Sequence, residues 1–146
     1  MIDRLLKDSR EYPRLFLWNG GVDRIVLDEW KSSGPGFVHP DVLEIWSKLG
    51  GGDIFETETI LSLNHKDESD AVKSMSKHHW SLGLPSRALV FHVGLCVSAM
   101  IDCDLPIVAY DFQTYAELGR FIDLDSWYLN VLRSEYQHRY GLEPGT

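Results

Sequence analysis

The pattern of apolar and polar positions predicts a helix most clearly over residues 40–49. Apolar side chains recur there with the spacing of one helical face: Val42, Ile45, Trp46 and Leu49. Pro40 stands in the first turn, where the missing N–H of proline is tolerated. The run Gly50-Gly51-Gly52 follows, and glycine readily adopts the left-handed conformation that ends a helix. We therefore expect the helix to begin at Pro40 and to stop at this glycine turn.

An alternating pattern predicts strands further along the chain. Residues 53–63 alternate in the manner of a strand, which places Glu56 and Glu58 on the same face. Three β-rich runs follow at residues 88–93, 95–101 and 106–110. Their short connections favour an antiparallel meander.

Weaker patterns complete the secondary structure. They predict a strand over 15–18, helices over 23–32, 71–79 and 114–121, and a last helix capped by Asp125 or Ser126. Residues 1–13 are interpreted as either a short helix or a loose lead-in, and residues 141–146 as a frayed tail. The order of elements favours one domain over residues 1–146, of the α+β class. Its simplest form is a mostly antiparallel central sheet with helices packed mainly on one face.

The charge balance narrows the range of partners. The 146 residues include 22 acidic and 14 basic side chains, a formal net charge of −8. Nucleic acid and anionic membranes are disfavoured, because both attract basic surfaces. A basic protein partner would be attracted instead. The first residues lack an apolar signal core, and no apolar run reaches the roughly 20 residues that span a bilayer. The expected location is cytoplasmic.

The cysteines and histidines do not form a metal or cofactor motif. Cys96 and Cys103 are not spaced as a metal or redox motif and are expected to be buried, reduced thiols. His78 and His79 are adjacent, and neighbours on a helix point in different directions, so the pair is interpreted as solvated. His92 lies in an apolar strand and is expected to be a hydrogen-bonded structural residue. No metal or cofactor is predicted.

The pair Glu56 and Glu58 is the strongest candidate for catalysis. Residues two apart on a strand are separated by about 6.6–7 Å, near the carboxylate spacing of some glycosidases. The same pair can also be two ordinary carboxylates on an outer sheet face, or an acidic patch that meets a basic partner. The chain has no Gly-x-Ser-x-Gly or phosphate-loop motif to support another reaction.

The run His39–Gly52 and the following strand resemble the signature of the SUKH superfamily, in its Smi–Knr branch. That signature is a proline followed by an acidic residue, an amphipathic helix with an aromatic side chain, and a glycine turn that enters a strand. Leu49 stands here where the family often has Asn before the glycines. Three later segments, Leu89–Gly94, Ile107–Asp111 and Tyr115–Ile122, resemble the family's later strands and closing helix.

The resemblance implies a protein-binding scaffold that has no chemistry of its own. Members of the family are chiefly immunity proteins that neutralise bacterial toxins, often nucleases, and eukaryotic relatives include a regulator of cell-wall synthesis. Three hypotheses follow: an immunity protein that binds a toxin, a housekeeping regulatory module of the same fold, and a hydrolase that uses Glu56 and Glu58. Acidic and aromatic residues near the sheet are the predicted contacts to a partner: Glu56, Glu58, Trp80, Asp102 and Asp104. The oligomeric state stays open.

Overall fold

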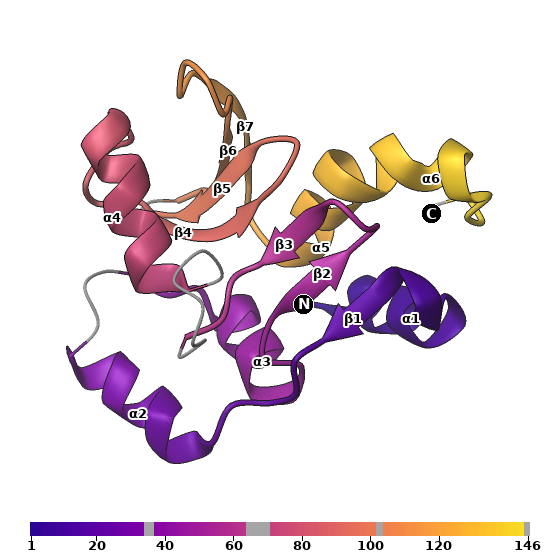
Figure 1. The fold of residues 1–146 in the computed structure, drawn as a ribbon, viewed down its shortest axis with the longest axis horizontal. Helices are drawn as coiled ribbons and strands as arrows, with labels where there is room; N and C mark the ends of the chain where they lie inside the picture. Colours follow the sequence, from indigo (N-terminus) through magenta and orange to yellow (C-terminus); the bar gives the residue numbers. More distant parts are fainter. Residues whose placement is uncertain (34–36, 64–70, 102–103, 145–146) are drawn as a thin grey trace.

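The computed structural model describes the chain except for residues 34–36, 64–70, 102–103 and 145–146. The elements in chain order are α1 (Asp3–Glu11), η1 (Pro13–Leu15), β1 (Phe16–Trp18), α2 (Arg24–Ser33), α3 (Pro40–Lys48), β2 (Gly52–Ile54), β3 (Glu58–Ile60), α4 (Val72–Leu82), β4 (Leu89–Val93), β5 (Val97–Met100), β6 (Ile107–Tyr110), β7 (Glu117–Phe121), α5 (Leu124–Trp127), η3 (Tyr128–Arg133) and α6 (Ser134–Tyr140). The seven strands form one sheet in sequence order, and every neighbouring pair is antiparallel (Figure 1). The predicted α+β class with an antiparallel central sheet is confirmed.

The predicted helix and glycine turn are present, and the turn joins two parts of the fold. His39 caps α3 by accepting the Asp41 backbone N–H at Nδ1, and Trp46 is buried with its Nε1–H donated to the Leu61 carbonyl. Gly50 has a φ of +84°, which favours glycine, and its N–H returns to the Ile45 carbonyl. A side chain at Gly50 would overlap the backbone of Gly20, so the turn after β1 packs directly on this turn.

The predicted single strand over residues 53–63 is wrong. β2 ends at Ile54, the chain turns at Phe55 and Glu56, and β3 begins at Glu58, antiparallel to β2. Both turn residues have positive φ, at 51° and 70°. The Phe55 ring enters the core and stacks on Tyr136, with centroids 4.8 Å apart. Burial of the Phe55 ring offsets the cost of the strained backbone. Apolar and polar residues still alternate through the turn, and for this reason the sequence indicated a continuous strand.

The meander of β4, β5 and β6 agrees with the prediction, and α4 extends the helix predicted over 71–79 to Leu82. α4 packs on β4, where Ser76 Oγ accepts the Val90 backbone N–H at a register shift. In this way a helix satisfies a strand amide at an irregular point of the ladder. Figure 1 shows α4 and α6 on opposite sides of the molecule.

The predicted helix over 114–121 is wrong, because this segment contains strand β7. Residues Glu117–Phe121 pair with β6, and the register shifts between Ala109 and Tyr110. The segment has apolar residues at helical spacing, but sheet pairing to a buried neighbouring strand outweighs that local preference. The part of the family resemblance that placed a closing helix at Tyr115–Ile122 therefore has no structural counterpart.

A continuous helical segment of α5, η3 and α6 closes the domain. Its cap is Asp123, whose side chain accepts the Ser126 N–H at 2.8 Å, and not Asp125 or Ser126 as predicted. η3 is π-helical, a geometry that brings residues five apart onto one face. Tyr128 and Arg133 accordingly both reach one carboxylate oxygen of Asp8, at 2.6 and 2.7 Å.

The two ends of the described chain are packed and not loose. Of the two alternatives for residues 1–13, the helix is present: α1 buries Leu5 and Asp8, and the latter pairs with Tyr128 and Arg133. Leu142 is also buried in the core, against the expectation of a frayed tail from residue 141. α1, α3 and the C-terminal helical segment are linked to one another, since Asp41 accepts the Leu124 N–H and Asp125 accepts the Arg4 N–H.

Candidate functional site

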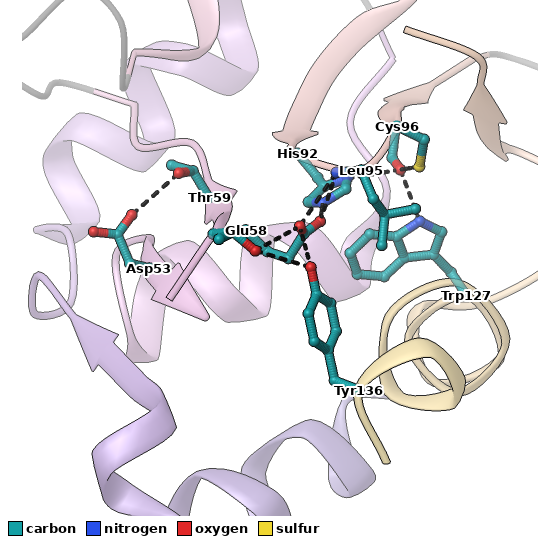
Figure 2. A network of polar contacts seen from close by, with 10 residues as sticks. Asp53, Glu58, Thr59, His92, Leu95, Cys96, Trp127 and Tyr136 are labelled. Atoms are coloured by element: carbon teal, nitrogen blue, oxygen red, sulfur yellow. Dashed lines mark hydrogen bonds and ion pairs between the residues drawn. The ribbon is translucent and has the colours of Figure 1, made fainter. Parts of the chain in front are cut away.

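A buried carboxylate at the start of β3 organises the largest polar network in the described core. Glu58 is 1% exposed, and its two oxygens bond His92 Nε2 at 2.9 Å, the Tyr136 hydroxyl at 2.7 Å and the Leu95 backbone N–H at 3.1 Å. These groups come from β4, from α6 and from the turn between β4 and β5 (Figure 2). One side chain of β3 therefore joins β4 and the turn that follows it to α6, which is far away in the sequence.

The network continues from His92 into β5 and α5. His92 Nδ1 lies 2.9 Å from Ser98 Oγ, and Trp127 Nε1 donates to the same oxygen at 2.9 Å. A carboxylate accepts hydrogen bonds, so Nε2 of His92 carries the hydrogen that faces Glu58. In the neutral ring, Nδ1 then accepts the Ser98 hydroxyl. We call Glu58, His92, Ser98, Trp127 and Tyr136 the Glu58 cluster.

The sequence carboxylate–imidazole–hydroxyl is also the arrangement that activates a serine nucleophile in hydrolases. In this protein, however, His92 and Ser98 are fully buried. The Ser98 oxygen accepts the indole N–H of Trp127, whose ring lies against His92 with centroids 5.1 Å apart. A nucleophile must reach its substrate, but the Ser98 hydroxyl is enclosed by described residues of the protein. The arrangement can hold segments together, but as folded it presents no reactive oxygen.

The electrostatics of the cluster favour an ionised Glu58. Burial acts to raise the pKa of this carboxyl, but the interactions with His92, Tyr136 and the Leu95 amide outweigh it and hold the pKa below its usual value. Burial and the bond to Glu58 raise the pKa of the Tyr136 phenol, so that it stays a donor. Burial likewise raises the pKa of the neighbouring Cys96 thiol to about 11, which keeps it protonated and unreactive near neutral pH.

A glycine makes room for the carboxylate. A Cβ at Gly94, in the turn between β4 and β5, would overlap both oxygens of Glu58. The next residue, Leu95, donates its backbone N–H to the same carboxylate. Gly94 thus leaves space for the Glu58 carboxylate and Leu95 bonds it. The Glu58 cluster in this way also fixes the position of the β4–β5 turn.

The two glutamates of the catalytic hypothesis do not form a pair. Glu58 is buried in the cluster, whereas Glu56 is exposed at the β2–β3 turn. They do not share one strand face, because Glu56 lies in the turn between β2 and β3 whereas Glu58 is the first residue of β3. The geometric basis for a glycosidase-like pair is therefore wrong, and Glu58 is also not a surface contact for a partner.

Two other predicted contact residues, Trp80 and Asp104, lie at the end of the sheet opposite the Glu58 cluster. Trp80 of α4 is half-buried against the core and donates its Nε1–H to the Ala88 carbonyl at 2.6 Å. Asp104 is exposed between β5 and β6. The register pairs Leu89 with Met100 at that end, whereas Glu58 contacts the β4–β5 turn at the other end. The predicted contacts therefore do not form one surface; Asp102 lies outside the described residues.

The histidines behave differently from one another. His92 is a hydrogen-bonded structural residue, as expected. His79 is half-buried and bonds the Tyr115 hydroxyl at Nδ1, so the interpretation of a solvated pair is wrong for this residue, while His78 is exposed. Burial and the neighbouring His78 lower the pKa of His79. Among the described residues, no three His, Cys, Asp or Glu side chains gather as ligands for a metal ion.

Sequence reasoning missed most of the cluster. Ser98, Trp127 and Tyr136 lie up to 78 residues from Glu58, and no local pattern joins them. One signal was present: a histidine and a serine six residues apart in two adjacent β-rich runs can face each other across a hairpin. In the parts of the chain that are described, no helix is long and apolar enough to span a membrane.

The chain was compared with models of protein families, with curated proteins and with solved structures, and none of the three comparisons found a match. The resemblance to the SUKH superfamily is therefore a hypothesis that rests on the helix–glycine–strand element.

Proposed function

We propose that this chain is a non-enzymatic protein-binding domain, and that its partner is a basic toxin that it neutralises. The main support for a non-enzymatic role is that the side chains suited to catalysis are buried and bonded inside the protein. Glu58, His92 and Ser98 are buried and bonded to one another or to structural partners. Side chains bonded in this way stabilise a scaffold, and a stable scaffold can present its surface for recognition.

The surface supports the same proposal. Large apolar side chains are exposed around the β4–β5 turn and β7: Leu95, Phe112, Leu118 and Ile122. Of these, Leu95 and Leu118 line one groove, and apolar side chains that gather on a surface often mark sites of protein association. The net charge of −8 favours a basic partner through faster association. The toxin as partner rests on the family resemblance, and the proposed cytoplasmic location rests on the lack of an apolar signal core in the first residues.

Co-expression tests the proposal directly. The chain is expressed with the product of each neighbouring gene, and complex formation is measured by co-purification and by size-exclusion chromatography. The expected result is one stoichiometric complex with a protein whose expression alone stops growth. A complex with a harmless protein would favour the housekeeping regulatory module instead. If none of the neighbouring gene products forms a complex with the chain, the immunity proposal is contradicted.

A further inference from the structure

A groove of about 340 Å³ lies between the sheet and η3, beside strand β7. Its walls combine the polar Asn130 with five apolar side chains: Leu95, Ala109, Leu118, Phe121 and Val131. Glu135 lies at its margin, is exposed, and is the charged side chain among the described residues that line it. The volume is within the range of sites that bind one small ligand or a few side chains.

The groove exists because small residues face the C-terminal helical segment at this point. Ser98, Ala109 and Gly119 are neighbours in register across β5, β6 and β7. Trp127 covers Ser98 at one end of this row, and its indole bonds the serine hydroxyl. Towards β7 the row continues as Ala109 and Gly119, and the Phe121 ring takes part of the space above Gly119.

The margin of the groove presents apolar side chains to solvent. Leu118 is the extra residue of the β-bulge opposite Ala109 and Tyr110, and it is 59% exposed. Ile122, which directly follows the groove residue Phe121, is 63% exposed. β7 is also the last strand of the sheet, and no described strand pairs with its outer edge. The edge also carries Glu117 and Arg120, which form an ion pair with each other, and an edge strand without a described partner can accept a further chain.

A second groove is larger but fits a partner less well. It lies between α2 and α3, has a volume of about 450 Å³, and is lined by Arg24 and Lys31 together with Asp28 and Glu44. Its charges are balanced, and Arg24 already lies 3.9 Å from Asp28. It gives no charge preference that would select a partner.

We propose that the β7 groove binds an apolar side chain from an extended segment of a basic partner protein, with an adjacent Lys or Arg of that segment contacting Glu135. The inference rests on the proposed function and adds the place and the chemistry of recognition. A second copy of this chain is disfavoured as occupant, because two chains of net charge −8 repel each other. Charge complementarity therefore selects a basic segment.

The Glu58 cluster has a role in this recognition as a support. The Leu95 backbone is held by Glu58, and Cys96, next along the chain, lies in the floor of the groove with its thiol 3.7 Å from Ser98 Oγ. The wall formed by the β4–β5 turn is therefore fixed before a partner arrives. A preformed wall lowers the entropic cost of binding.

Selection from a library of short random peptides tests the groove without knowledge of the partner. Peptides are selected on the wild-type chain, and their affinities are then measured for Leu118→Asp, Glu135→Lys and the control Asp104→Lys, which lies at the other end of the sheet. We expect enriched peptides to carry an apolar residue beside Lys or Arg. Leu118→Asp should weaken binding at least about tenfold, mainly through faster dissociation. Glu135→Lys should slow association most at low salt, whereas Asp104→Lys, with the same change of net charge, should slow it less and leave dissociation unchanged.

The outcomes separate this inference from the proposed function. Tryptophan fluorescence and thermal unfolding first establish that each variant is folded. Two results would overturn the proposal that the β7 groove binds a basic segment. One is equal affinity of the selected peptides for the wild type and for both groove variants, and the other is enrichment of peptides without basic residues. If a neighbouring gene product still binds the groove variants with unchanged affinity, protein binding stands and this location is wrong. If no neighbouring product binds the wild type, the immunity function fails, whatever the peptides do.

Discussion

The substitution Glu58→Gln isolates the contribution of the buried carboxylate at almost constant shape. Glu58 bonds His92 at 2.9 Å, Tyr136 at 2.7 Å and the Leu95 amide at 3.1 Å. The glutamine side chain has one N–H₂ group in place of an oxygen, so either the N–H groups of His92 and Leu95 face another donor or the Tyr136 hydroxyl must turn to accept. The hydrogen bonds that remain also lose the charge of the carboxylate.

The expected loss follows from these contacts. Hydrogen bonds to a charged group contribute roughly 1.5–3 kcal/mol each, and a buried donor that loses its partner costs about 1–3 kcal/mol. Partial rearrangement of the Tyr136 hydroxyl offsets some of this loss, because Thr57 Oγ1 lies 2.9 Å away as an alternative acceptor. We therefore expect Glu58→Gln to lower the free energy of unfolding by about 2–4 kcal/mol. The urea midpoint should fall by roughly 1–2 M and the melting temperature by roughly 10 °C.

The assay is equilibrium unfolding in urea followed by tryptophan fluorescence, since Trp127 lies in the Glu58 cluster. Glu56→Gln is the matched control, because it makes the same chemical change at an exposed position two residues away. The control should stay within about 0.5 kcal/mol of the wild type. A double-mutant cycle with Tyr136→Phe should give a coupling free energy of about 1 kcal/mol or more. Equal stability of the two glutamine variants would refute the assignment of Glu58 as the centre of a stabilising network.

Three further predictions concern the same region. The pKa of Glu58 is lowered in the folded chain, so its contribution to stability is complete at neutral pH and is lost as pH falls from about 4.5 through the folded pKa. The loss of stability in acid should therefore be smaller in Glu58→Gln than in the wild type. An equal loss in the two chains would contradict this prediction. Gly94→Ala should destabilise the wild type by about 1–3 kcal/mol because its Cβ overlaps the Glu58 carboxylate, and clearly less in a Glu58→Ala background, as urea unfolding of the four chains would measure. In a Cys103→Ser variant, which removes the other thiol, Cys96 should react with a thiol reagent at neutral pH only as fast as the chain unfolds, because burial raises its pKa to about 11; rapid labelling of the folded chain would contradict its burial.

The local sequence determined those elements whose patterns agree with their final surroundings. The α3 helix and its glycine stop were predictable, because amphipathic spacing, a first-turn proline and a φ of +84° at Gly50 all favour one structure. The β4–β6 meander was predictable for the same reason, since its strands are β-rich and joined by short turns. The role of His92 as a hydrogen-bonded core residue followed from its apolar neighbours.

Tertiary structure alone decided the rest. Glu58 was predicted on a surface strand, but burial of the Phe55 ring against Tyr136 breaks that strand and turns the carboxylate inward to partners up to 78 residues away. β7 was predicted as a helix, and its pairing with β6 overrides the local pattern. The groove beside β7 depends on which small residues align across three strands, a property of register and not of any one segment. Helix and turn signals act over a few residues, whereas burial and register depend on the whole chain, and these set both the polar core and the surface that we propose for binding.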